Sequence, residues 1–168
     1  VVVHKNKETR GNLDDKCCGI PQFDLGDLKS VENLMKHNVP KLLQEIDEGF
    51  DIISLVPSCV LMFKQELPLL FDENDDLKKI KQHIFDPFEY LSDRESKGLM
   101  NKSFKNSLGK IAYQVAGHQR VQNIGPKTKE LLEMVPDTEV QAIERCSGHD
   151  GTYACLLYTS DAADDCWS

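Results

Sequence analysis

The feature that most constrains the fold is an alternation of short apolar runs with longer segments of helical periodicity. The runs 50–57 (FDIISLVP), 110–118 (KIAYQVAGH) and 138–145 (TEVQAIER) are rich in β-branched residues and predict strands. The opening VVV predicts the end of an earlier strand. Because helical segments separate the strands from residue 50 onward, we expect an α/β fold with a parallel sheet flanked by helices.

Between these strands, apolar residues recur at spacings that place them on one face of a helix. Pro40 predicts either two helices or one kinked helix before Gly49. Asp86 followed by Pro87 is a typical helix start, because proline suits the first turn. The segments predicted as helices are 24–49, 60–71, 73–85, 86–100 and 125–136.

Length and charge limit the classes of function. A chain of 168 residues is long enough for one domain with a hydrophobic core. Its formal net charge of −8 leaves no basic surface to neutralise phosphates, which argues against nucleic acid as a partner. No apolar run approaches the roughly 20 residues that span a bilayer. We therefore expect a cytoplasmic protein without a transmembrane segment.

Cysteines carry the chemistry that the sequence offers. Cys17 and Cys18 are adjacent and precede a glycine turn, whereas Cys59 and Cys146 each follow a predicted strand. His118 ends the strand predicted at 110–118. Since ligands in open α/β sheets bind at the carboxyl ends of strands, we expect these five side chains to meet at one edge of the sheet. Soft thiolates select iron–sulfur clusters, zinc or copper(I).

Other interpretations of the same residues stay open. An isolated Cys59 or Cys146 is also typical of a small apolar side chain in a core. His118 can be a ligand, a hydrogen-bond donor behind the ligands, or a core histidine. Spacing does not separate iron–sulfur from zinc, because no Cys-x-x-Cys pair is present. The common nucleotide-binding and hydrolase motifs are absent from the sequence.

Four stretches taken together resemble the cysteine-rich CCG domain family: CCGIPQFDLGD, VPSCVLMFKQELPLLF, GHQRVQNIGPKTKELLEMVP and ERCSGHDGTYA. That family includes cysteine-rich subunits of heterodisulfide reductase and of anaerobic glycerol-3-phosphate dehydrogenase. The resemblance implies a partial domain over 1–155, built from two pseudo-repeated halves and truncated at both ends. The segment 156–168 is predicted to be a non-native tail, because YTSDAADD resembles translated sequencing-adapter sequence.

The resemblance also implies a site and a role. Cys17, Cys18 and Cys59 correspond to ligands of the first half, Cys146 is the ligand left in the second, and His118 lies beside Gly117, where the family usually has cysteine. The implied cofactor is an iron–sulfur cluster of the 4Fe-4S type, with zinc as the alternative. The implied function is a non-catalytic electron-transfer subunit of an oxidoreductase, which the zinc alternative replaces by a structural or interaction module without redox activity.

The same resemblance implies partners. They are a flavoprotein or other redox subunit, with a quinone or a disulfide as acceptor. Through such a partner, the chain is expected at the inner face of a membrane while remaining a cytoplasmic protein.

Overall fold

The strands are divided between two sheets in the computed structural model, which describes residues 1–6, 8–11, 14–71 and 74–145. One sheet has the strand order β2-β1-β3-β4, and the other consists of β5 and β6. The pairs β3–β4 and β5–β6 are parallel, and helices pack against both sheets, so the predicted α/β class is confirmed. The strands are β1 (Val2–Lys5), β2 (Glu8–Gly11), β3 (Asp51–Ile53), β4 (Ile84–Phe85), β5 (Gly109–Gln114) and β6 (Thr138–Ile143).

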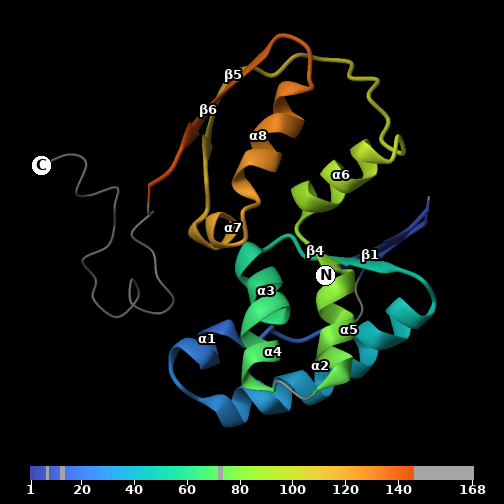
Figure 1. Ribbon diagram of the computed structural model, residues 1–168, viewed down its shortest axis with the longest axis vertical. Coiled ribbons are helices and arrows are strands. Elements are labelled where there is room, and N and C mark those ends of the chain that lie inside the picture. The colour runs from blue at the N-terminus through green and yellow to red at the C-terminus, as the bar shows by residue number, and fades with distance from the viewer. Residues whose placement is uncertain (7, 12–13, 72–73, 146–168) are drawn as a thin grey trace, which may run out of the picture.

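The helices gather mainly around the first sheet. Figure 1 shows α1, α2, α4 and α5 toward one end of the long axis, and α8 beside β5 and β6 at the other. The helices are α1 (Ile20–Asp24), α2 (Leu28–Asp47), α3 (Pro57–Leu61), α4 (Leu67–Leu70), α5 (Asp75–His83), α6 (Pro87–Ser96), α7 (Gly117–Val121) and α8 (Gly125–Glu133), with a π-helical turn η1 (Met62–Glu66) between α3 and α4.

The amino-terminal strands are antiparallel, which the alternation of strands and helices did not predict. β1 pairs antiparallel with β2 on one side and with β3 on the other. Asn6 follows β1 with a φ of 56°, a left-handed conformation that asparagine tolerates better than most residues. β2 runs antiparallel beside β1, so the sheet is mixed and not wholly parallel.

Helix α2 is continuous, and Pro40 lies inside it. Proline cannot donate a backbone hydrogen bond to the carbonyl of Lys36, four residues earlier. Both Pro40 and Lys36 are exposed, so water can reach that carbonyl. The segment therefore forms one helix and not two, and this helix places Val31, Asn38 and Leu42 on a single buried face.

The helical segment after β3 begins at Pro57 and not at residue 60 as predicted, so Cys59 lies in the first turn of α3. In η1 the Leu67 N–H donates to the Met62 carbonyl, five residues earlier. Pro68 follows at once, lacks an N–H, and in a regular helix would press against the Lys64 carbonyl. The wider turn relieves that clash, and wider turns of this kind often occur at functional sites.

The boundary between α5 and β4 differs from the predicted helix over 73–85. The helix ends at His83, and Ile84 pairs in parallel with Ile52. Asp86 then caps α6, accepting a hydrogen bond from Phe88 N at 2.9 Å, with Pro87 in the first turn as predicted.

The main core fills the space between the first sheet and helices α2, α5 and η1. Cys18 belongs to this core, and Cys59 packs against it. Side chains that are almost completely buried include Val3, Val31, Leu42, Ile52, Met62, Leu67, Leu77, Ile80 and Ile84.

The second sheet is half-covered, whereas the segment 110–118 was predicted to be a buried strand. Exposed residues alternate along β5 with half-buried ones, because this sheet packs against α8 on one face. After β5 the chain turns into α7, whose buried Gln119 donates a hydrogen bond to Asp86 Oδ2 at 3.0 Å. This buried contact connects α7, which follows β5 of the second sheet, with the start of α6, which follows β4 of the first sheet.

Candidate thiol site

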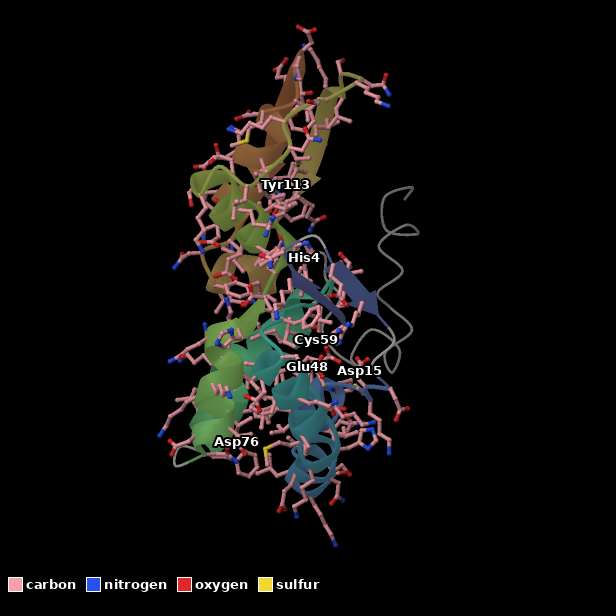
Figure 2. All side chains as sticks on the ribbon, turned by 90° about the vertical axis from the view of Figure 1, so that its right-hand side faces the viewer. His4, Asp15, Glu48, Cys59, Asp76 and Tyr113 are labelled. Carbon is pink, nitrogen blue, oxygen red and sulfur yellow. The ribbon has the colours of Figure 1, made fainter. Side chains whose placement is uncertain are left out.

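A cavity of about 500 Å³ lies between β1, α2 and the junction of β3 with α3. Three thiols line it, those of Cys17 and Cys18 from the glycine turn and that of Cys59 from α3. Figure 2 shows Cys59 and Asp15 near the middle of the long axis, between Tyr113 and Asp76. The other lining residues are Val1, Val2, Asp15, Lys16, Asn38, Leu42, Ser54, Leu55, Val56, Phe63 and Ile84.

The Cys17–Cys18 turn is fixed to α2 by one buried side chain, Asn38. Its Oδ1 accepts from Lys16 N at 2.9 Å, and its Nδ2 donates to the carbonyls of Lys16 at 3.2 Å and Cys17 at 3.1 Å. A buried amide is costly unless it is hydrogen-bonded, so these three bonds fix both Asn38 and the turn.

Gly19 allows the turn to pass close to the core. Its φ is 97°, a conformation that side chains rarely adopt, and it precedes α1. A Cβ at this position would lie 3.7 Å from side-chain atoms of Val31, Leu34 and Met62. This close approach carries the neighbouring Cys18 into the core, where it is 9% exposed, while Cys17 stays exposed.

The Cys59 thiol is half-buried in the first turn of α3. Its interaction with the Cys18 thiol lowers the pKa of Cys59 to about 7; burial opposes this shift, and the hydroxyls of Ser54 and Ser58 add to it. The same interaction, together with burial, raises the pKa of Cys18. The pair therefore favours a Cys59 thiolate that accepts a hydrogen bond from a neutral Cys18 thiol.

The structure brings Cys17, Cys18 and Cys59 together although 41 positions separate the last two. It places His118 elsewhere, exposed on α7 and outside the cavity lining. We expected His118 at the same edge because we expected one sheet, whereas β5 belongs to a separate sheet. Cys146 and the tail 156–168 lie outside the described residues.

Sequence reasoning missed two polar residues of the site. Asn38 lies on the apolar face of α2, at helical spacing from Val31 and Leu42, and an amide on such a face indicates a buried hydrogen-bond partner. Ser54, buried at 4% exposure, directly follows β3, interrupts the apolar run 50–57 and lines the cavity. Both signals were present in the sequence.

No protein-family model matches this chain, and no solved structure matches it. Among the described helices, none is long and apolar enough to cross a membrane.

The side chains at the cavity are of the type that binds soft metals, but too few of them are grouped closely. Three thiols around one cavity are the ligands that iron–sulfur clusters and zinc prefer. Among residues 1–6, 8–11, 14–71 and 74–145, however, no three His, Cys, Asp or Glu side chains are grouped closely enough to hold a metal ion. Cys59 packs against the core cluster that contains Cys18, and Cys17 lines the same cavity as both.

Proposed function

We propose that the chain is an iron–sulfur-binding, electron-transfer subunit of an oxidoreductase, with its cluster held at Cys17, Cys18 and Cys59. The observation that carries the proposal is the position of these three thiols around one cavity. The resemblance of the CCG turn and its partner segments to the CCG domain family supports the same function. Substrate oxidation then belongs to a partner subunit.

Each residue of the site has a definable part. The three cysteines supply thiolate ligation, and Cys59 reaches the thiolate form more readily than Cys18, since the pKa of Cys59 is lowered to about 7 and that of Cys18 is raised. Asn38 positions the turn, and apolar side chains such as Leu42 and Phe63 limit water around the sulfurs. When bound, the cluster supplies one-electron redox chemistry. A four-thiolate cluster would take its remaining ligand from outside the described residues.

The partners follow from the same proposal. Electrons come from a flavoprotein or another redox subunit and pass to a quinone or a disulfide, in the cytoplasm or at the inner face of a membrane. Leu55 and Val56, at 70% and 51% exposure, border the cavity and offer apolar contact area to such a subunit.

Zinc binding in a structural module is the second candidate. It is favoured by the burial of Cys18 in the hydrophobic core. A metal bridging Cys18 and Cys59 would fasten the amino-terminal turn to α3 and stabilise the fold without redox chemistry.

Metal analysis of anaerobically purified protein tests the proposal. We expect visible absorption, iron and acid-labile sulfide in the wild type, and their loss in Cys18→Ser and Cys59→Ser. Cys166→Ser is the matched control, because it removes a thiol of the predicted non-native tail, and it should keep the wild-type content. Colourless protein with stoichiometric zinc would establish the second candidate. Metal content unchanged in both cavity variants would refute both.

A further inference from the structure

The thiols that line the same cavity can also undergo oxidation when no metal is bound. Cys59 is half-buried and lines a cavity that small molecules can enter, whereas Cys18 lies behind it in the core. Both thiols line the same cavity, and Cys59 packs against the core cluster to which Cys18 belongs. An accessible thiol beside a buried one is the arrangement in which oxidation of the first is followed by attack from the second.

We propose that Cys59 is a site of oxidation by small hydroperoxides and that Cys18 resolves the product as a Cys18–Cys59 disulfide. This inference goes beyond the proposed function, because it concerns the thiols when no metal is bound. The oxidant is hydrogen peroxide or a short alkyl hydroperoxide, which a cavity of about 500 Å³ admits.

The chemistry balances in two steps. In the first, the Cys59 sulfur attacks the peroxide, the O–O bond breaks and an S–O bond forms. The products are a sulfenic acid and, after the thiol proton moves to the leaving oxygen, water or an alcohol. In the second, the Cys18 sulfur attacks the Cys59 sulfur, the S–S bond forms and the S–O bond breaks. The hydroxide leaves with the Cys18 proton as water, so the two thiols lose two electrons in total.

The surroundings of the two thiols indicate that Cys59 is oxidised first and that Cys18 attacks second. Access favours Cys59 as the first sulfur oxidised, because Cys18 is 9% exposed. Buried Ser54 lines the same cavity as Cys59, so the cavity also presents a hydroxyl group. Cys17 is exposed on the solvent side of the turn and is the neighbouring thiol that this proposal leaves unused.

Consequences for metal binding follow directly. The disulfide consumes two of the three thiols that line the cavity. Oxidised protein is therefore expected to lose its capacity for a soft metal until a reductant restores the pair.

The test uses the full chain, reduced and stripped of metal, treated with hydrogen peroxide at stoichiometric amounts. Digestion without reductant and mass spectrometry should identify a peptide that links Cys18 with Cys59. In Cys18→Ser or Cys18→Ala the link is lost, and dimedone, a trap for sulfenic acid, labels Cys59. Cys17→Ser should form the link as the wild type does. Circular dichroism of each variant establishes that it is folded.

Two outcomes would overturn the proposal. One is a link that joins Cys17 and not Cys18 to Cys59. The other is oxidation of Cys59 no faster than that of Cys166, with no link in folded wild-type protein. Iron, sulfide and zinc are measured separately on unoxidised samples of the same variants. In the wild type, metal binding without formation of the disulfide therefore counts against this inference alone, and formation of the disulfide without metal binding counts against the proposed function alone.

Discussion

Replacing Asp86 with alanine should destabilise the fold far more than removing an ordinary helix cap. One carboxylate oxygen of Asp86 caps α6 at Phe88 N, and the other accepts from Gln119 Nε2 at 3.0 Å in a buried hydrogen bond. Gln119 also accepts from the Tyr113 hydroxyl at 2.8 Å. Asp86 is 1% exposed and Gln119 6% exposed, so water does not replace the lost partner.

The magnitude is the sum of two effects. Loss of a helix cap costs about 1 kcal/mol. The buried Gln119 amide left without its acceptor costs about 1–3 kcal/mol more. We therefore expect Asp86→Ala to lower the free energy of unfolding by roughly 2–4 kcal/mol. The matched control is Asp27→Ala, which removes an exposed cap that accepts from Ser30 N at 3.1 Å and should cost about 1 kcal/mol.

Urea unfolding, followed by circular dichroism, gives the free energies of the variants. A double-mutant cycle with Gln119→Ala isolates the pair, and the double variant should cost less than the sum of the single variants. The prediction is wrong if Asp86→Ala lowers the free energy of unfolding no more than Asp27→Ala does, or if the cycle gives no coupling energy. In either case the contact between Asp86 and Gln119 does not stabilise the junction of α6 with α7.

Two further predictions concern the thiol site and the packing of α8. Iodoacetamide should alkylate Cys59 with a rate that rises through a pH midpoint of about 7. Cys18→Ala removes the donor and should move that midpoint up toward 9.0; an unchanged midpoint would contradict the interaction. Gly125→Ala places a Cβ 2.7 Å from Val115 Cγ1, and it should lower the free energy of unfolding, measured with urea, by about 1–3 kcal/mol. The control Gly117→Ala, with open space around the new Cβ, should lower it by under about 0.5 kcal/mol. Equal costs would contradict the close packing.

Local signals in the sequence predicted the elements better than their boundaries. Asp86 with Pro87 was predicted as a helix start and is one, because capping depends on residues within one turn. Pro40 was ambiguous for the opposite reason: its effect depends on whether water reaches the Lys36 carbonyl, which tertiary structure decides. The end of α5 at His83 likewise depends on Ile84 finding a strand partner in Ile52.

The thiol site depended on contacts between distant segments, and the sequence predicted them unequally. Cys59 was placed near the end of β3 by a local rule, and Cys18 reaches it because Gly19 and Asn38 hold the turn against α2. Neither the close approach of Gly19 to the core nor the hydrogen bonds of Asn38 to the turn were predicted, although a glycine after the two cysteines and an amide on the apolar face of α2 were visible in the sequence. The interaction that lowers the pKa of Cys59 is tertiary, since Cys18 lies 41 positions away.

The separate position of His118 shows why periodicity could not predict which strands share a sheet. In β5 and the residue after it, Ile111, Tyr113 and Val115 face the covered side, while Lys110 and Gln114 are exposed. This period of two indicates a sheet with one solvated face, which the sequence already showed and which argues against a strand buried on both faces. The residues of a strand indicate which of its faces is covered, but they do not indicate which strand pairs with it. β5 pairs with β6, which packs against α8. His118 therefore follows a strand of the second sheet, whereas Cys59 follows β3 of the first sheet.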